Sequence, residues 1–311
     1  MPLLKRKCVL AAKIETTSGT AETVTATDAA FNAYNAIMQP SIAMTQREGQ
    51  GGFGWLSSVP EGHQGAASFR TYLEWDGTAT EPSWADTFFP ACGWVKSSQT
   101  YSPLTEAPGS SVKTLTIAHY QNGIRKLLYG CMGTFVVTLP TGKAGYIDWT
   151  FTGKWGGVTD ATILAPTYPT DRALRYAGGL AEWNDINLCV ESAVIDAGNE
   201  VILRECPTSE TGYAAALVTN RQPKIKVNPE ATTVAAQDRW GLWLSRTEYA
   251  LELDVSGATD ELLSFDAAKA QIMNNQEGDR RGMITDEIEF QCNKNGANLD
   301  QELQITFTAA S

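Results

Sequence analysis

The chain has 311 residues, a net charge of −11 and a charged fraction of only 19%. At about 100 to 200 residues per domain, this length predicts two domains, and the many apolar residues argue against intrinsic disorder. Residues 1–160 hold 12 basic and 12 acidic side chains, so residues 161–311 hold the other 12 of 24 basic and 23 of 35 acidic ones. This acidic excess argues against nucleic-acid binding through phosphate contacts, which depend on basic residues.

The cysteines and the hydropathy pattern indicate a protein that folds in a cytosol. Six cysteines are scattered without a CxxC pair, as expected of reduced thiols rather than a disulfide framework. The apolar stretch at residues 9–12 is too short for a signal peptide, and the chain has no run of about 18 apolar residues that could cross a membrane.

Taken in chain order, the pattern predicts an N-terminal arm followed by short strands. Residues 1–35 lack a sustained period and are expected to form the arm. In residues 134–139 and 146–152, apolar and polar residues alternate, which predicts two half-buried strands. The turn-forming residues 140–145 between them predict a hairpin. Residues 156–182 are rich in Gly, Pro, Thr and Ala and are expected to link two units.

The second half repeats these signals. Alternation in residues 287–292 and 303–308 predicts another pair of strands around a turn. One short helix is expected in each half, the first capped by Ser83 and containing Trp84, the second from Asp238 to Leu244 with Trp240 and Trp243. The tryptophans fall on apolar faces, so cores are expected for them. Pro90 is expected to end or kink the first helix early.

Four landmarks recur at nearly one spacing, which predicts duplication of a whole module. They are Arg47-Glu48 and Arg204-Glu205 at 157 residues, then Phe69 and Ile225, Trp84 and Trp240, and the segments TFTG ending at Gly153 and TFTA ending at Ala309, each at 156. The predicted fold class is therefore mainly β: two similar β-sandwich or partial-barrel modules, each with one short helix. Residues 1–160 would hold the arm and first module, and residues 161–311 the linker and second module.

The chain offers little catalytic or metal-binding chemistry. Its two histidines, His63 and His119, lack a nucleophile motif, and no spacing of a zinc, EF-hand or nucleotide site occurs. Glu287 and Glu289 share a strand face at about 6.6 Å by strand rise, within glycosidase range, but nothing nearby marks a sugar site. No enzyme activity, catalytic residue, metal or cofactor is expected.

Several segments resemble the tail tube proteins of long-tailed, siphovirus-type bacteriophages. The resemblance covers most of the chain after residue 35, through motifs that are structural rather than catalytic. They are residues 195–205, Gly212-Tyr213, residues 220–223 and 228–231, Lys269-Ala270-Gln271, the loop Gly278-Asp279-Arg280-Arg281-Gly282, residues 300–307, Tyr120 to Gly123, Gly130 to Gly133 and DWTFTG ending at Gly153.

The resemblance implies a structural virion protein that is assembled in the host bacterial cytoplasm and forms stacked rings around a lumen through which DNA passes. With two modules per chain, trimeric rings with pseudo-sixfold symmetry are expected, and hexamers are the second choice. The partners implied are further copies and other tail proteins (tape measure, terminator and distal tail), without specific DNA binding and without a membrane. The arm and the loop Gly278, Asp279, Arg280, Arg281, Gly282 are expected between subunits or rings.

An acidic lumen would keep DNA from sticking, with screening limiting the effect to about 8 Å. The residues expected to face the lumen are Glu287, Glu289, Glu252, Asp254 and Asp148. Three alternatives stay open at this point: a distal tail or baseplate ring protein of the same fold, a carbohydrate- or receptor-binding β-sandwich, and a hydrolase that uses His63 or His119.

Overall fold

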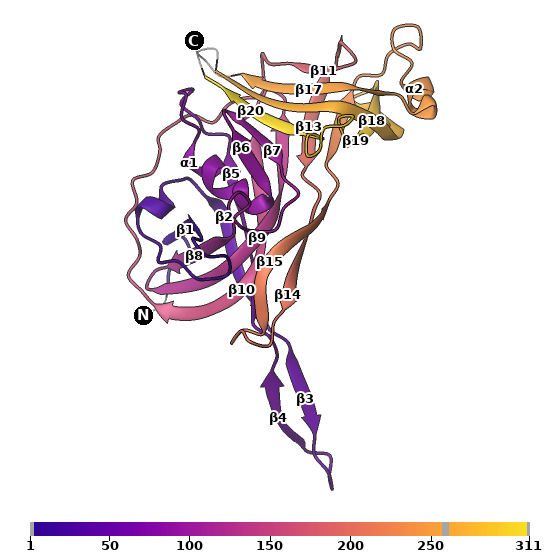
Figure 1. The fold of residues 1–311 in the computed structure, drawn as a ribbon. Helices are drawn as coiled ribbons and strands as arrows, with labels where there is room; N and C mark the ends of the chain where they lie inside the picture. Colours follow the sequence, from indigo (N-terminus) through magenta and orange to yellow (C-terminus); the bar gives the residue numbers. More distant parts are fainter. Residues whose placement is uncertain (1–2, 257–260, 310–311) are drawn as a thin grey trace.

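The computed structural model describes residues 3–256 and 261–309, and in these ranges the protein is mainly β with two short α-helices (Figure 1). The first half contains β1 (Cys8–Ile14), β2 (Tyr34–Ser41), β3 (Met44–Glu48), β4 (Trp55–Pro60), β5 (Gln64–Tyr72), α1 (Ser83–Phe88), β6 (Trp94–Ser97), β7 (Thr100–Pro103), β8 (Leu115–Gln121), β9 (Ile124–Pro140) and β10 (Tyr146–Asp160). The second contains β11 (Ala181–Trp183), β12 (Ile186–Asn187), β13 (Val190–Asp196), β14 (Asn199–Glu205), β15 (Tyr213–Arg221), β16 (Lys224–Pro229), α2 (Arg239–Ser245), β17 (Glu248–Ser256), β18 (Leu262–Arg280), β19 (Met283–Cys292) and β20 (Gln304–Thr308).

One sheet runs through both halves of the chain. Its main path follows the order β12-β11-β17-β18-β19-β16-β13-β9-β10-β5-β2, and all pairs along it are antiparallel. The halves meet where the end of β9 pairs with β13, with Val137 opposite Ile195. Backbone hydrogen bonds therefore join the two expected modules directly.

The predicted alternation in the first hairpin is confirmed. Phe135, Val137, Ile147 and Trp149 are fully buried, whereas Asp148 between two of them is not. These side chains belong to one large core that continues into the second half, where Phe265, Phe290 and Phe307 are equally buried. Aromatic rings pack against each other throughout it, for example Phe135 and Trp149 with centroids 5.4 Å apart.

The second predicted hairpin is wrong, because β19 and β20 do not pair with each other. β19 pairs with β16 and β18, and β20 pairs with β18 and β7. β18 is 19 residues long and is lined by β19 along its later part and by β20 along residues 262–266. In the first half the single strand β10 pairs with β9 from Ile124 to Thr138 apart from two bulges. Residues 293–303 interrupt the corresponding strand in the second half.

The two helices differ in how they start and how far they are buried. Asp238 caps α2 by accepting a hydrogen bond from the Gly241 amide, but Ser83 does not cap α1; its hydroxyl donates to the carbonyl of Ala30. α1 ends at Phe88, before Pro90, as expected. The core position expected for Trp240 is wrong: this residue is 45% exposed, because none of the residues that the structure describes covers that face of α2.

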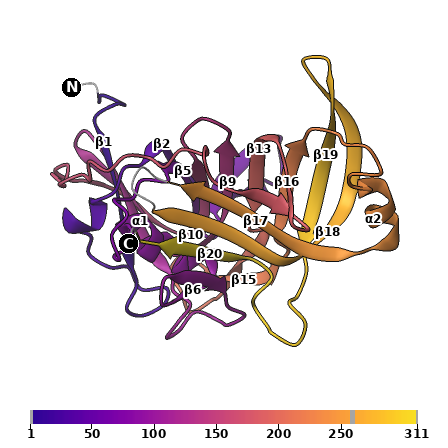
Figure 2. The ribbon, with the colours of Figure 1, turned by 90° about the horizontal axis from the view of Figure 1, so that it is seen from above.

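The segment expected as an arm lies against the first half. β1 pairs with β8 over seven residues, and Val24 and Ala29 cover the outer face of this pair. Residues 161–164 of the expected linker add Ile163 and Leu164 to the same small cluster. Seen from above, the N-terminal strand lies at one end of the molecule, and α2 with the β18–β19 hairpin lies at the other (Figure 2).

A buried carboxylate holds the N-terminal segment in place. Glu15 is 3% exposed and accepts hydrogen bonds from the Gly19 and Gly130 amides and from the Thr114 and Thr116 hydroxyls, at 2.6 to 2.9 Å. A buried charge is tolerated only with such complete hydrogen bonding. This single side chain thus connects the N-terminal segment with β9 and with the residues around β8.

We expect Glu15→Ala to lower the free energy of unfolding by about 3 kcal/mol or more, because four donors, three of them in buried hydrogen bonds, lose their acceptor. Chemical denaturation of the purified protein measures the change. Glu48→Ala, at an exposed position on β3, is the matched control and should stay within about 0.5 kcal/mol of wild type. An equal effect of both substitutions would contradict the assigned role.

Candidate functional site

Eight neighbouring strands of the sheet, β18-β19-β16-β13-β9-β10-β5-β2, carry polar side chains on the side opposite the core; we call this surface the polar face. It includes three of the five acidic residues expected at a lumen: Asp148 on β10, and Glu287 and Glu289 on β19. They come to one face because each alternates with a buried residue along its strand.

Asp148 is neutralised by an arginine on the adjacent strand. The Arg70 guanidinium donates to both Asp148 oxygens at 2.8 Å, and it lies over the Tyr146 ring at 3.6 Å. Hydrogen bonding to Asp148 raises the pKa of Arg70 above its ordinary value. Planar two-point contacts of this kind fix both side chains, so Asp148 does not act as a free negative charge.

Glu289 is neutralised in the same way. Lys226 lies 2.9 Å and Lys224 3.1 Å from its carboxylate oxygens, both from β16. Hydrogen bonds from Lys226 and then Lys224 lower the pKa of Glu289. Lys226 is 156 residues after Arg70, so both halves pair an acid with a cation at corresponding places. Glu287 has no ion pair among the described residues and accepts a hydrogen bond from Thr285.

A row of charged side chains crosses the middle of the polar face. Lys224 stands opposite Asp196, Asp196 opposite Val136, Val136 opposite Asp148, and Asp148 opposite Arg70. Two anions therefore lie on either side of Val136 with one cation beyond each, so these five positions carry no net charge. The expectation of an acidic wall does not describe this row, because sequence alone did not show which cations the register places beside the acids.

Glu252 and Asp254 lie on a different part of the sheet. They are on β17, which pairs with the first part of β18, whereas Glu289 lies opposite the later residue Asn274. Glu252 stands opposite Asp266 on one side and Glu182 on the other. Burial, followed by the charges of Asp254 and Glu252, raises the pKa of Asp266 to about 7. Four acidic side chains of the second half therefore lie close together here.

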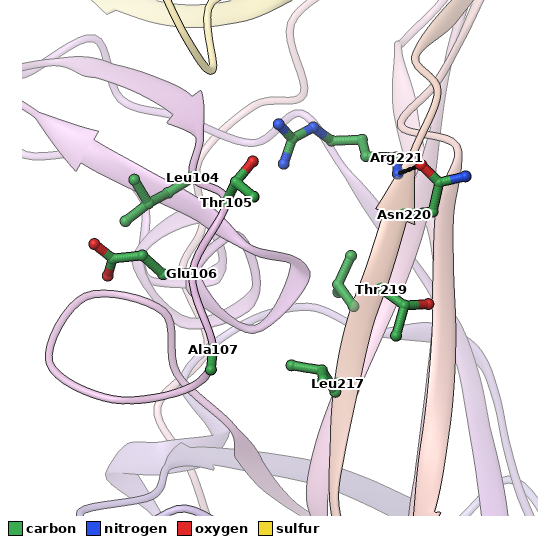
Figure 3. Close-up of a pocket in the computed structure, with 9 residues that line it drawn as sticks. Leu104, Thr105, Glu106, Ala107, Leu217, Thr219, Asn220 and Arg221 are labelled. Atoms are coloured by element: carbon green, nitrogen blue, oxygen red, sulfur yellow. Dashed lines mark hydrogen bonds between the residues drawn. The ribbon is translucent and has the colours of Figure 1, made fainter.

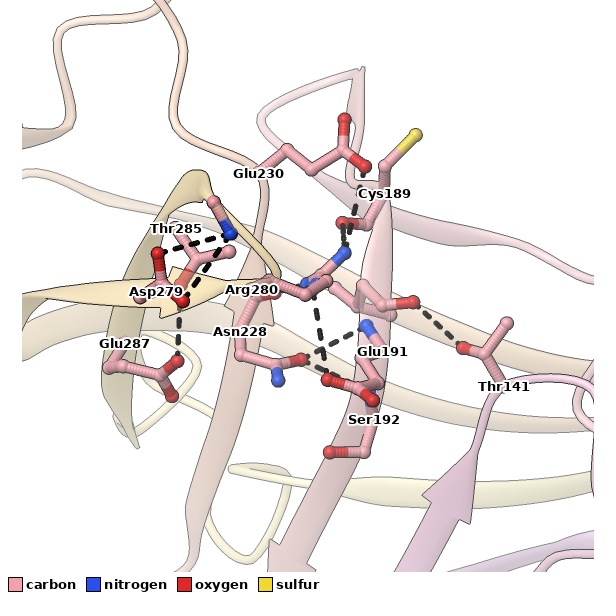
Figure 4. Close-up of polar contacts among 12 residues, drawn as sticks. Thr141, Cys189, Glu191, Ser192, Asn228, Glu230, Asp279, Arg280, Thr285 and Glu287 are labelled. Atoms are coloured by element: carbon pink, nitrogen blue, oxygen red, sulfur yellow. Dashed lines mark hydrogen bonds and ion pairs between the residues drawn. The ribbon is translucent and has the colours of Figure 1, made fainter.

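The expected inter-subunit loop is the turn of the β18–β19 hairpin. Arg281 and Gly282 have positive φ values of 54° and 87°, and the Asp279 carboxylate accepts from the Gly282 amide. Arg280 folds back onto its own half, donating to the carbonyls of Cys189 and Asn228 and lying near Glu191 and Glu230 (Figure 4). Within the described residues, therefore, Arg280 holds the hairpin tip against β13 and β16.

A pocket of about 470 Å³ lies between residues 104–107 and 217–221 (Figure 3). Its arginine is already engaged, since Arg221 contacts Glu302 at 2.6 Å and Asp300 at 3.0 Å. The histidines lie elsewhere. His119 on β8 is 1% exposed, and burial lowers its pKa to about 4, so it is neutral at physiological pH. The described residues contain no group of three or more His, Cys, Asp or Glu placed to hold a metal ion.

Sequence reasoning missed the most exposed apolar element, the β3–β4 hairpin. It projects from the body as a two-stranded ribbon (Figure 1), and all residues of both strands are exposed. Phe53 at its tip is fully exposed, and Trp55 is 62% exposed. The available signal was the run of glycines between residues 49 and 54, which marks a turn between two short β segments.

The corresponding hairpin of the second half is packed. β14 and β15 lie on β9 and β10 of the first half, where Val201, Leu203 and Val218 cover Met132. The Asn199 side-chain amide donates to the carbonyls of Cys92 and Gly133. The protein therefore contains one supported hairpin and one without support in the single chain.

No protein-family model matches the sequence, and no curated protein shows significant similarity to it. No helix of the described ranges 3–256 and 261–309 is long and apolar enough to span a membrane.

The acidic group on β17 and β18 predicts a pH-dependent stability. The raised pKa of Asp266 means that the fold favours the protonated acid, whose ordinary pKa is 3.8. Asp266 does not change the free energy of unfolding below about pH 4, where it is protonated in both the folded and the unfolded chain. It lowers the free energy of unfolding as pH rises, and the full loss is reached above about pH 7. We expect Asp266→Asn to match wild type near pH 4 and to be more stable by about 2 kcal/mol or more at pH 8.

Urea denaturation at a series of pH values measures this difference. Asp160→Asn, at an exposed position at the end of β10, is the control and should show no such pH dependence. A difference between Asp266→Asn and wild type that is the same at pH 4 and pH 8 would contradict the assignment.

Proposed function

We propose that the protein is a self-assembling structural component of a phage tail, the tube protein, which forms rings that stack around a DNA-conducting lumen. The resemblance in sequence motivates this proposal, and the strand order of the sheet is the structural observation that supports it. The proposal includes the duplication of one module, location in the virion, and the absence of catalytic activity.

The strand order supports two equivalent four-stranded units. In the first half β2-β5-β10-β9 are neighbours in the sheet, and in the second half β13-β16-β19-β18 are neighbours. In both halves a hairpin joins the first two strands and a short helix follows the second. The last strand of the first unit, β9, pairs with the first strand of the second unit, β13. The chain thus contains one joint between consecutive units.

The two outermost of these eight strands, β2 and β18, are the ones that could form the same kind of backbone pairing with another copy. In the described residues β2 pairs only with β5, so its other edge is open. β17 pairs with β18 only as far as Gln271, and beyond it β18 pairs only with β19. Open edges tend to pair with further strands. We infer that β18 of one copy pairs with β2 of the next, as β9 pairs with β13.

A closed ring removes both open edges, and its copy number follows from the units per chain. Three chains supply six units and give a trimer with pseudo-sixfold symmetry, whereas six chains would supply twelve. The polar face would then line the lumen. Its paired charges suit a wall along which DNA slides, because the row through Asp196 and Asp148 offers no unpaired lysine or arginine to phosphates.

The β3–β4 hairpin supports contact between rings. An isolated two-stranded ribbon is at best marginally stable in water, and exposed apolar patches mark interaction sites. The hairpin extends away from the sheet (Figure 1), so it reaches beyond the ring to which its own chain belongs. Tape measure, terminator and distal tail proteins would be the other partners, at the lumen and at the tube ends.

Ring stoichiometry tests the proposal. We expect native mass spectrometry and electron microscopy of the purified protein to show rings or tubes with three chains per ring. Six full chains per ring would reject the trimer but keep the tube, and a single ring that never stacks would favour the distal-ring alternative. A protein that stays monomeric at high concentration would reject the proposed function.

Substitutions in the hairpin should separate ring formation from stacking. Phe53→Ser combined with Trp55→Ser is expected to leave rings intact and to raise the critical concentration for tubes by about tenfold or more, because two exposed aromatic side chains lose their partner surface. Turbidity and electron microscopy measure tube formation.

Leu299→Ser is the matched control, since Leu299 is 71% exposed but lies outside the hairpin, and it should assemble like wild type. Normal tubes from the double variant would show that the hairpin is not the stacking element.

A further inference from the structure

Helix α2 carries an apolar face that is open in the single chain. Trp240 is 45% exposed and Leu244 is 83% exposed, and their spacing of four residues places them on one side of the helix. Trp243 packs beside Trp240, with ring centroids 6.1 Å apart. We call Trp240 and Leu244 the α2 face.

The helix that presents this face is firmly held. Arg239, 2% exposed, forms an ion pair with Asp286 of β19 at 2.7 Å and donates to the carbonyl of Glu230. Asp238 caps the first turn, and the helix packs against β18. The exposure of Trp240 and Leu244 therefore belongs to a fixed surface.

The same two positions in the first half are buried. Trp84 and Phe88 precede Trp240 and Leu244 by 156 residues each, and they are 3% and 0% exposed. The two helices have the same place in the element order, after the second strand of each four-stranded unit. The difference therefore comes from what covers each helix.

The cover of α1 comes partly from the unit that follows it in the sheet. Phe307 on β20 lies 6.0 Å from Trp84 and 5.3 Å from Trp75, measured between ring centroids. β20 pairs with β7, which belongs to the segment between α1 and β8. In the second half only Arg246 and Thr247 separate α2 from β17, so the chain has no corresponding segment to cover α2.

We infer that the α2 face is a second contact between copies, covered by the first half of the next chain in the ring. The inference rests on the proposed ring, in which the unit that follows α2 belongs to another copy, just as the unit that follows α1 belongs to the same chain. The partner is a second copy of this protein. The position of the α2 face supports a second copy as the partner. Helix α2 packs against β18, and the later part of β18 has the open edge proposed to pair with the next copy. Met273, 46% exposed, lies on that part of β18.

The test compares ring formation by Trp240→Ser/Leu244→Ser with that of wild type, using sedimentation velocity over a concentration series. Leu244 is 83% and Trp240 45% exposed in the single chain, so the variant should stay folded, and its unfolding midpoint is measured beside that of wild type. The concentration at which rings form should rise by about tenfold or more. Leu244→Lys is a second, single-residue variant. It should also raise the concentration at which rings form, because the contact would bury the lysine charge.

Tyr168→Ser, at a 43% exposed residue of the segment between β10 and β11, is the matched control and should form rings like wild type. Hydroxyl-radical labelling adds a direct readout: Trp240 should be labelled in the monomer and protected in the ring. This inference alone would be overturned if both α2 variants formed rings at the wild-type concentration and Trp240 of the wild-type protein were labelled equally in the monomer and in the ring. A wild-type protein without rings would overturn the proposed function and this inference together.

Discussion

The structure depends on the backbone pairing between β9 and β13. A strand has two edges whose amide and carbonyl groups need partners, and a small β unit cannot satisfy both of its outermost edges by itself. Here the last strand of the first four-stranded unit meets the first strand of the second, so one pair of edges is satisfied inside the chain. The same arrangement leaves β2 and the later part of β18 open. The proposed pairing of β18 with β2 of the next copy follows from these open edges.

The two halves have the same strand order but different surroundings. The first half is closed by β1, by the segment between α1 and β8, and by β20 from the far end of the chain. In the second half, no segment corresponds to the one between α1 and β8, so α2 lacks this cover. In the first half, the β3–β4 hairpin lacks the packing that β14 and β15 receive. The exposed apolar residues of the β3–β4 hairpin and of α2 therefore lie where one half has a covering element and the other does not. A head-to-tail contact between copies would supply the missing cover, and in a ring such contacts close.

Charge on the polar face is arranged by register more than by composition. The second half has a large acidic excess, yet Glu289 lies between two lysines and Asp148 is held by Arg70. Glu252, Asp254 and Asp266 lie close together on β17 and the first part of β18, where Asp266 has a pKa near neutrality. A wall of paired charges neither binds phosphates strongly nor repels them strongly, which suits a passage for DNA. Such pairs contribute little to stability at an exposed surface, so their value would lie in this balance.

The sequence by itself determined the mainly β class, the alternation of buried and exposed residues in β9 and β10, the break at Pro90, and a spacing of 156 residues that also relates Trp84 to Trp240 and Arg70 to Lys226. These features are local, because a period of two or a turn residue acts within a few positions. Only the tertiary structure decided that β19 and β20 do not pair, that the N-terminal segment lies on the first half, and that Trp240 is exposed. It also decided which cation meets which acid. Those outcomes depend on which strands become neighbours across long stretches of chain, and one residue type can be buried in one half and exposed in the other because its cover comes from elsewhere in the sequence.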